Sequence, residues 1–243
     1  MIIDAHCHLG QGRYKCLSAD ALLKSMDDNG IDKAVIVPVE EYIAVNNEEG
    51  NAFILSQVKR NPGRFYGFAV ASPWYGAAAA ENLKRFLDKG LAGVKFNSCI
   101  QGFTLNDDIV YPLIEVAKDY RVPVFFHTGT PMQALPLHLR ELAQRYPDVD
   151  FIMGHMGAWD FGYDVFHAAQ GMGNLYLDIS KNLAAVVASR LKDTGADRMI
   201  FSSDMPRSDQ RFELDKLKEV CTDEADFERI CCKNIMKLLE KKK

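Results

Sequence analysis

Two histidines separated by a single residue open the chain, and this spacing can hold a metal ion. His6 and His8 lie in the apolar stretch IIDAHCHL, which is typical of a buried strand. Because side chains alternate along a strand, both histidines point to one face and Cys7 to the other, where it is expected to pack as a small apolar residue. Asp4 has the same parity as the histidines and is expected to lie deeper, orienting a ligand or a lysine.

Other side chains that bind metals end later apolar stretches. His127 ends VPVFFH, His155 ends DFIMGH and Asp204 ends MIFSSD. Two protein ligands seldom hold a catalytic metal alone, so these three residues are the candidates that complete the site. Imidazole nitrogens with a carboxylate suit Zn²⁺ best, and Mn²⁺ is the next choice. His138 and His167 lie in helical patterns, and we expect structural roles for them.

These polar positions belong to a regular alternation of strands and helices. Parallel strands need crossover helices, so eight strand–helix units in 243 residues favour a single (β/α)8 TIM barrel, one domain over residues 1–243. An open doubly wound sheet is the alternative, but no GxGxxG follows the first strand. Active sites of such barrels lie at the carboxyl ends of the strands, where the candidate ligands stand. The expected strands begin near Ile2, Lys33, Phe65, Ala92, Val122, Asp150, Leu175 and Met199.

The composition limits the classes of partner. The formal net charge is −4, and no cluster of basic residues precedes the terminal KKK, so nucleic acid is not an expected partner. No apolar stretch approaches the roughly 18 residues of a membrane span, and no signal peptide is visible. The six cysteines form no CxxC pair and are typical of reduced thiols. We expect a cytoplasmic protein that acts on a small molecule.

With these residues the sequence resembles the amidohydrolase superfamily, in particular the amidohydrolase-related branch that includes aminocarboxymuconate-semialdehyde decarboxylase. The similar segments are IDAHCHL, GVKF followed by QGF, VPVFFHTG, FIMGHMG, IFSSDMP and FERICCKNIMKLL. They span almost the whole chain in the expected order. The opening HxH is shared by many metal-dependent barrels, whereas the ordered set is much more specific.

The resemblance implies a metal site and roles for its residues. It implies one divalent ion held by His6, His8, His127 and Asp204, with Asp204 also moving a proton. His155 would stand beside the metal and polarise water or substrate. Asn234 matches a structural motif near the last helix of the branch, whose members are commonly dimers, so a homodimer is compatible with the sequence.

The reaction predicted from these residues is hydrolysis of a small ester, lactone or amide. A bound metal ion lowers the pKa of water from about 15.7 towards about 7, and Asp204 accepts the proton. The branch also contains decarboxylases of unsaturated or aromatic acids with nearly the same residues, and the sequence leaves that alternative open. A TatD-like nuclease is less favoured, because the fourth strand reads AGVKFN and lacks a glutamate. A metal-binding barrel without activity is also less favoured.

Residues on the fourth strand and in the loops after the strands are candidates for contacts with substrate. Because arginine suits bidentate capture of a carboxylate, we expect a small carboxylated substrate. The branch often has Lys-x-His-Pro on the fourth strand, and Asn97 stands where the histidine would be, which puts that contact in doubt. Lys95 is expected to pair with Asp4 or to face the substrate carboxylate; a carbamylated Lys95 that bridges two ions is less favoured, so no second ion is expected. The loop candidates are Arg13, Tyr14, Gln101, Trp159 and Arg207.

Overall fold

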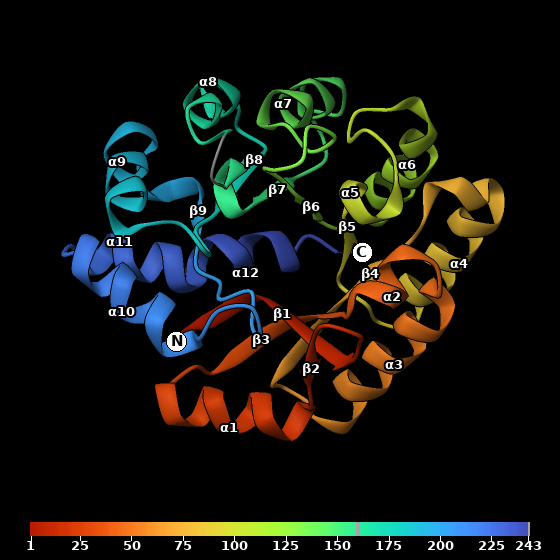
Figure 1. The fold of residues 1–243 in the computed structure, drawn as a ribbon, viewed down its shortest axis with the longest axis horizontal. Coiled ribbons are helices and arrows are strands. Elements are labelled where there is room, and N and C mark those ends of the chain that lie inside the picture. The colour runs from red at the N-terminus through yellow and green to blue at the C-terminus, as the bar shows by residue number, and fades with distance from the viewer. Residues whose placement is uncertain (159–160, 243) are drawn as a thin grey trace.

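Parallel strands surrounded by helices make up the part of the chain that the computed structural model describes, residues 1–158 and 161–242 (Figure 1). The strand order is β2-β1-β3-β4-β5-β6-β7-β8-β9, and neighbours from β1 to β9 pair in parallel. Each predicted apolar run contains one of these parallel strands. They are β1 (Ile3–Gln11), β3 (Lys33–Pro38), β4 (Phe65–Val70), β5 (Gly93–Phe96), β6 (Val124–His127), β7 (Phe151–Gly154), β8 (Leu175–Asp178) and β9 (Met199–Ile200).

The last strand returns to the first and closes the sheet. The segment after β9 runs beside β1, where the Asp204 N–H donates to His6 O (2.9 Å) and the His8 N–H donates to Met205 O (2.7 Å). The predicted (β/α)8 barrel is therefore confirmed. The short strand β2 (Cys16–Leu17), which pairs antiparallel with the end of β1, was not predicted.

Helices follow the strands and cover the outside of the barrel. The first of them illustrates the local signals: the Ala21 N–H donates to Ser18 Oγ (3.1 Å) at its start, and Gly30 ends it with φ 67°. The α-helices are α1 (Ala19–Asn29), α2 (Glu40–Ala44), α3 (Asn47–Arg60), α4 (Gly76–Asp88), α5 (Ser98–Gln101), α6 (Tyr111–Tyr120), α7 (Pro136–Arg145), α8 (Asp164–Ala169), α9 (Ala184–Thr194), α10 (Gln210–Val220), α11 (Glu224–Glu228) and α12 (Asn234–Leu239). Shorter helical turns are η1 (Pro73–Tyr75), η2 (Asp108–Val110), η3 (His155–Gly157), η5 (Ala196–Arg198) and η6 (Arg229–Lys233).

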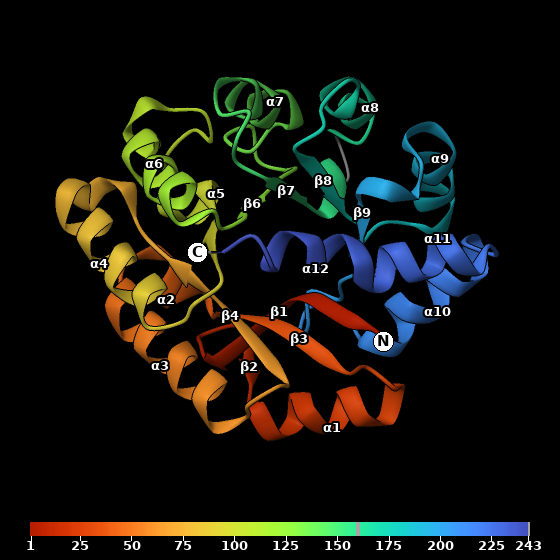
Figure 2. The same cartoon turned by 180° about the vertical axis from the view of Figure 1, so that it is seen from behind.

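The barrel interior has an apolar layer that is closed at one end by α12. Side chains of the strands, among them Ile3, Phe68 and Tyr176, pack in one cluster with Ile235 and Leu238 of α12. Figure 2 shows α12 lying across this end. The apolar layer thus fills the amino-terminal end of the barrel and leaves the polar strand ends at the opposite side.

A bulge in β1 changes the predicted alternation of its side chains. The register of β1 against β3 shifts between Asp4 and Cys7. Ala5 belongs to the inner cluster, and His6 also faces the interior, with its ring centroid 4.4 Å from that of Phe125. Asp4 consequently lies on the outer side of the strand, so its predicted common face with His6 and His8 is wrong.

The partners of Asp4 are groups outside the barrel. Its carboxylate accepts from Ser203 Oγ (2.6 Å), from the Ser203 N–H (2.8 Å) and from Gln210 Nε2 of α10 (2.8 Å). The predicted pair of Asp4 with Lys95 is therefore also wrong. Asp4 instead ties the first strand to the segment after the last strand and to α10.

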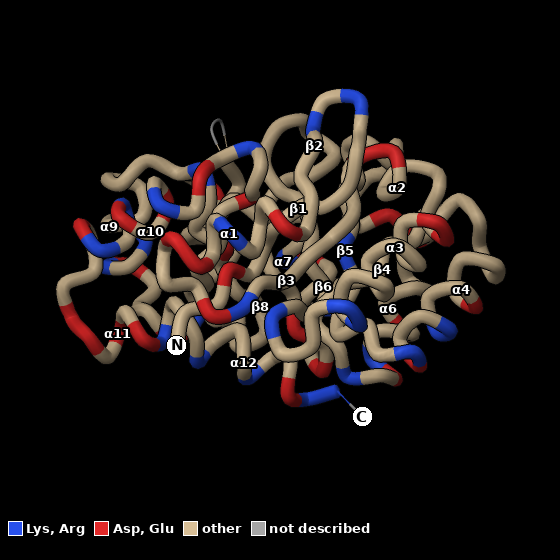
Figure 3. The backbone as a smooth tube through the Cα atoms, turned by 90° about the horizontal axis from the view of Figure 1, so that it is seen from below, with Lys and Arg blue, Asp and Glu red and all other residues tan. Residues whose placement is uncertain are grey.

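The distribution of charged residues and the lengths of the helices are further features of the described chain. Along the backbone trace in Figure 3, acidic and basic residues are interspersed. Among the described helices, none is both long and apolar enough to cross a bilayer.

Candidate metal centre

His6, His8 and Asp204 meet at the carboxyl end of the barrel. Asp204 Oδ1 lies 3.3 Å from His8 Nε2 and 3.6 Å from His6 Nδ1, and all three side chains are buried. One potential ligand atom from each lies within 4.8 Å of the other two. Two imidazoles and a carboxylate at this spacing form a set that can hold a divalent cation.

The histidines of this group have the chemistry of metal ligands. Neither ring nitrogen of His6 has a hydrogen-bond partner among the described residues, although both are buried, and buried polar atoms are nearly always paired. The Nδ1 of His8 lies 2.9 Å from the carbonyl of Pro38, so an Nδ1–H donated there leaves Nε2 as the ligand atom. Burial lowers the pKa of both His6 and His8 and keeps the imidazoles neutral, as metal binding requires.

A second group shares His6 with His155 and Asp178. Asp178 Oδ2 lies 3.7 Å from His6 Nδ1 and 3.8 Å from His155 Nδ1. His155 has φ 63°, a left-handed conformation that is costly for a non-glycine residue and concentrates at functional sites. Its Nδ1 also lies 2.8 Å from Ser180 Oγ, which fixes the ring beside His6.

Asp178 belongs to this site but was not among the predicted site residues. It ends β8 at zero exposure and accepts from the N–H groups of His155 (3.1 Å) and Ser180 (2.8 Å) and from Ser202 Oγ. The signal that could have identified it is a charged residue within the apolar run LYLDIS, the same signal that identified Asp204.

His127 borders the centre from β6. Its ring centroid lies 5.0 Å from that of His155 in an edge-to-face arrangement. Burial and then the charge of Lys95 lower the pKa of His127 to about 3, so the ring is neutral at physiological pH. His127 is in neither of the two groups found among the described residues, and its role as a ligand stays a prediction.

Lys95 lies inside the barrel beneath the histidines. Its Nζ is 3.8 Å from the centroid of Phe125, and it has no hydrogen-bond partner among the residues described. Burial lowers the pKa of Lys95 to about 7, although the charges of Asp204 and Asp178 oppose the shift. An amine so placed can meet an anionic group that enters the site.

Several of the predicted substrate contacts in the described loops have structural partners. Tyr14 is 80 % exposed, and the guanidinium of Arg13 lies 5.4 Å from the centroid of its ring. Arg207 donates to Glu40 Oε1 (2.8 Å), and Asn97 caps α5 by accepting from the Ile100 N–H (3.4 Å). Gln101 also has backbone partners, and Trp159 lies outside the described residues.

Two lysines that were not predicted also lie at the polar end of the barrel. Lys15, in the β1–β2 hairpin, is buried and its Nζ is 3.2 Å from Glu40 Oε1. Lys181, three residues after β8, has its Nζ 3.7 Å from Asp204 Oδ2. Figure 3 shows the hairpin projecting from the side of the barrel opposite to α12, with basic residues at its tip. The polar end of the barrel therefore carries basic residues, of which Lys15 is paired with Glu40 and Lys181 lies beside Asp204.

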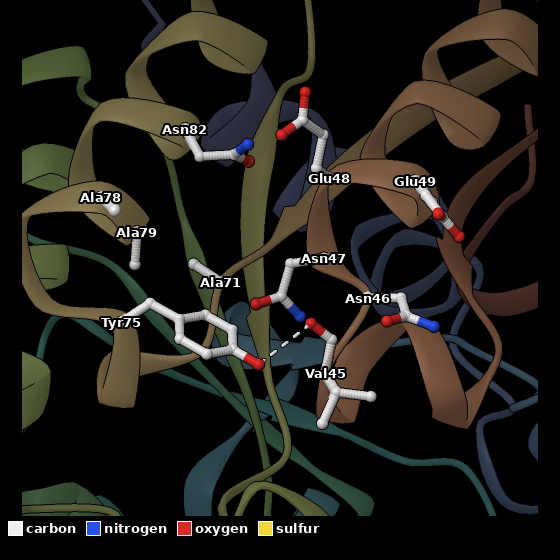
Figure 4. Close-up of a pocket in the computed structure, with 10 residues that line it drawn as sticks. All are labelled: Val45, Asn46, Asn47, Glu48, Glu49, Ala71, Tyr75, Ala78, Ala79 and Asn82. Atoms are coloured by element: carbon white, nitrogen blue, oxygen red, sulfur yellow. Dashed lines mark hydrogen bonds between the residues drawn. The ribbon is translucent and has the colours of Figure 1, made fainter.

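A pocket away from these residues is lined by structural groups. It lies between the start of α3, η1 and α4, as Figure 4 shows. Tyr75 Oη donates to the carbonyl of Val45 (3.4 Å), and Asn47 accepts from the Ser72 N–H (2.6 Å). None of the predicted site residues lines it.

Comparisons with known proteins agree with this geometry. The model of the amidohydrolase family matches residues 3–241. A gamma-resorcylate decarboxylase of Polaromonas sp. (strain JS666) is 24 % identical over 283 residues, covering 91 % of this chain and 87 % of the relative.

Solved structures show the same fold. A 2,6-dihydroxybenzoate decarboxylase from Rhizobium superposes with a TM-score of 0.81 at 19 % identity, covering 98 % of both chains. A dihydroxybenzoic acid decarboxylase from Polaromonas sp. JS666, with bound manganese and the inhibitor 2-nitroresorcinol, has a TM-score of 0.79 at 20 % identity, covering 98 % of this chain and 96 % of the other. The match to the family model extends over nearly the whole sequence, and the chain belongs to the amidohydrolase family.

Proposed function

We propose that this amidohydrolase-family enzyme is a metal-dependent, non-oxidative decarboxylase of a small aromatic or unsaturated carboxylic acid. The relative of similar sequence and two of the similar structures are decarboxylases of dihydroxybenzoic acids, which favours the decarboxylase alternative over the predicted hydrolase. A cytoplasmic location and a homodimer remain predictions.

The observation that carries this proposal is the charge around Asp204. Lys181 contacts this buried carboxylate, and Lys95 lies below it without a hydrogen-bond partner among the described residues. Lys15, from the hairpin, is engaged by Glu40, and Asp178 is a second buried carboxylate of the site. The lysines next to Asp204 suit a substrate that brings its own negative charge.

His6, His8 and Asp204 would hold the metal ion, with His127 as a further ligand. When bound there, Mn²⁺ or Zn²⁺ supplies a Lewis acid that polarises the oxygen atoms of the substrate. The chemistry of the donors fits both ions, and the bound manganese in the Polaromonas structure makes Mn²⁺ as strong a choice for this chain as the predicted Zn²⁺.

In the proposed reaction Asp204 acts as the general acid. The pKa of Asp204 lies well below its usual value, so the group is a carboxylate at rest. It takes up from solvent the one proton that the reaction consumes and passes it to the carbon that bears the substrate carboxylate. The bond from that carbon to the carboxylate carbon then breaks, its electron pair returns to the ring or double bond, and CO₂ leaves. The net reaction consumes the carboxylate and one proton and yields the decarboxylated product and CO₂.

The other residues orient the substrate and stabilise charge. Lys95 is suited to stabilise negative charge on an oxygen of the substrate during proton transfer. His155, fixed by Ser180, is suited to orient an oxygen on the opposite side. Burial of these groups excludes water and strengthens each interaction.

The proposal is tested with protein reconstituted with Mn²⁺ or Zn²⁺. We expect 2,6-dihydroxybenzoate or 5-carboxyvanillate to release CO₂ with an equal amount of decarboxylated product, measured by trapped CO₂ and liquid chromatography. Asp204→Asn should remove this activity. Hydrolysis of lactones, esters or amides, without CO₂ from any acid, would instead establish the hydrolase.

A further inference from the structure

A cleft opens between the segment after β8 and helix α10, next to the candidate metal centre. One wall carries Lys181 and Leu183, and the other carries Arg207 and Phe212. Leu183 is 71 % and Phe212 63 % exposed, so the cleft presents two large apolar side chains to solvent. The rest of the lining includes the ion pair of Glu213 with Lys216 and two further carboxylates, Asp215 and Glu219. The inner wall of the cleft therefore places apolar surface next to the ammonium group of Lys181, and an aromatic acid can use both.

Lys181 is held in an unusual backbone conformation on the inner wall. Its φ is 62°, and its N–H donates to Glu213 Oε1 (3.1 Å). Glu213 has zero exposure, accepts from Ser208 Oγ (2.8 Å) and is ion-paired with buried Lys216. Lys216 Nζ in turn donates to the carbonyl of Asn182 (3.0 Å). A left-handed lysine fixed by buried charges is a costly arrangement of the kind that is typical of functional sites.

The side chain of Lys181 connects this cleft to the metal centre. Its Nζ lies 3.7 Å from Asp204 Oδ2, and its side chain is 22 % exposed to solvent. Arg207, by contrast, is engaged by Glu40 at 2.8 Å. Lys216, the third basic residue of the lining, is ion-paired with Glu213. Of these three cations, Lys181 is therefore the one placed between entering substrate and the acid–base group.

We propose that this cleft is the binding site for a planar aromatic carboxylate and that Lys181 binds its carboxylate. Leu183 and Phe212 contact the ring, and Glu213 positions Lys181 through its backbone. This inference rests on the proposed function, because it assigns the substrate of the same centre. It predicts selection by charge: an aromatic acid binds more tightly than its neutral amide.

The competing explanation is that Lys181 only neutralises Asp204. In that case its removal would change binding of charged and neutral ligands alike, or of neither. A pair of ligands that differ only in charge separates the two explanations. Benzoate and benzamide form such a pair, and their rings carry no hydroxyl groups to activate decarboxylation.

The experiment measures the dissociation constants of benzoate and benzamide on the metal-reconstituted protein by ligand-observed NMR. We expect Lys181→Met to weaken benzoate about tenfold, as loss of one charge-assisted hydrogen bond does, and benzamide by less than about twofold. Lys181→Arg should keep benzoate within about threefold. The exposed Lys192 of α9 provides the matched control, and Lys192→Met should change neither constant.

A second variant tests the apolar side of the cleft without touching its charges. Phe212→Ser, at an exposed position, should weaken benzoate and benzamide by a similar factor of about five. Equal weakening of both ligands by Lys181→Met, no effect of that variant, or no binding of benzoate to the wild type at millimolar concentration would overturn the inference.

The failure of this inference is distinguishable from failure of the proposed function. If Lys181 is required for selective binding of benzoate but no acid releases CO₂, the binding site is supported and the decarboxylase activity is excluded. If CO₂ is released and Lys181→Met leaves the KM for 2,6-dihydroxybenzoate unchanged, the decarboxylase stands and the assignment of Lys181 does not.

Discussion

His8 Nε2 and Asp204 Oδ1 lie 3.3 Å apart, although one residue comes from the first strand of the barrel and the other from the segment after the last. The same two segments are joined by the backbone hydrogen bond from Asp204 to the carbonyl of His6 (2.9 Å). The candidate metal centre thus lies across the seam where the barrel closes. A cation bound there would connect the two ends of the fold.

Metal binding should therefore stabilise the whole fold. We expect the wild type to bind about one Zn²⁺ or Mn²⁺ per chain and the double variant His6→Ala/His8→Ala to bind none, measured by elemental analysis. Metal at a concentration of about 100 Kd adds about 2.7 kcal/mol, which raises the Tm of a chain of this size by roughly 5–10 °C. The exposed His167 provides the control: His167→Ala should keep both the metal and the shift in Tm. A wild type that takes up no ion after reconstitution would contradict the metal centre.

Asp204 should be required for turnover more than for folding. Asp204→Asn keeps the size of the side chain but cannot supply a proton, so we expect the rate of CO₂ release to fall by about 10²–10⁴-fold. The control is Asp193→Asn, at an exposed position of α9, which should leave the rate unchanged. Circular dichroism should show native spectra for both variants. A rate for Asp204→Asn within a factor of ten of the wild type would exclude the assigned role.

The sequence predicted the barrel and the end of it at which the polar residues lie. Both follow from the spacing of apolar residues and from the alternation of strands with helices along the chain. Apolar runs separated by helical patterns favour parallel pairing, and parallel strands bring their carboxyl ends together. His6, His8, His155 and Asp204 were found on this basis, and they lie together in the structure. The same reasoning could have included Asp178.

Features that depend on local backbone geometry were not predictable from the pattern. The bulge between Asp4 and Cys7 turns Asp4 outward, and nothing in IIDAHCHL marks it. Lys181, whose Nζ lies near Asp204, has a left-handed backbone conformation. A glycine or an asparagine in the sequence would suggest this conformation, but a lysine does not. Asn97, a predicted substrate contact, also caps α5. That role was not predictable, because a helix of four residues is too short to produce a periodic pattern in the sequence.

Glu40, at the start of α2, forms ion pairs with Lys15 of the β1–β2 hairpin and with Arg207, and these pairs should make the stability of the fold depend on pH in the acid range. Burial raises the pKa of Glu40, but the hydrogen bond from Arg207 and the charge of Lys15 more than offset this and bring the pKa to about 2, below its usual 4.5. The stabilisation is therefore complete above about pH 4.5 and is lost as the pH falls towards 2. We expect Glu40→Gln to lower the free energy of unfolding by roughly 1 kcal/mol at pH 7, measured by urea denaturation.

The difference between the wild type and Glu40→Gln should shrink as the pH is lowered from 4.5 to 3. The exposed Glu81 of α4 provides the matched control, and Glu81→Gln should show no difference at any pH. A difference for Glu40→Gln that stays constant down to pH 3 would mean that its pKa is not lowered.

The buried pair Glu213–Lys216 should behave as a unit in stability. Both side chains are at most 5 % exposed, so Lys216→Met leaves a buried carboxylate without its partner and should cost roughly 3–5 kcal/mol. Glu213→Gln keeps an oxygen that accepts from the Lys181 N–H, and combined with Lys216→Met it removes both charges. We therefore expect the double variant to be more stable than Lys216→Met alone, measured by urea denaturation as a double-mutant cycle.

An exposed pair on the same helix gives the comparison for this cycle. Arg211 and Asp215 lie 3.6 Å apart with side chains 79 % and 57 % exposed, so Arg211→Ala should cost no more than about 0.5 kcal/mol. If the effects of Glu213→Gln and Lys216→Met simply add, the two side chains do not depend on each other. In that case the position of Lys181 would not depend on the ion pair, and Lys216→Met should leave benzoate binding unchanged. If the effects do not add, the ion pair helps to hold Lys181, and Lys216→Met should weaken benzoate binding.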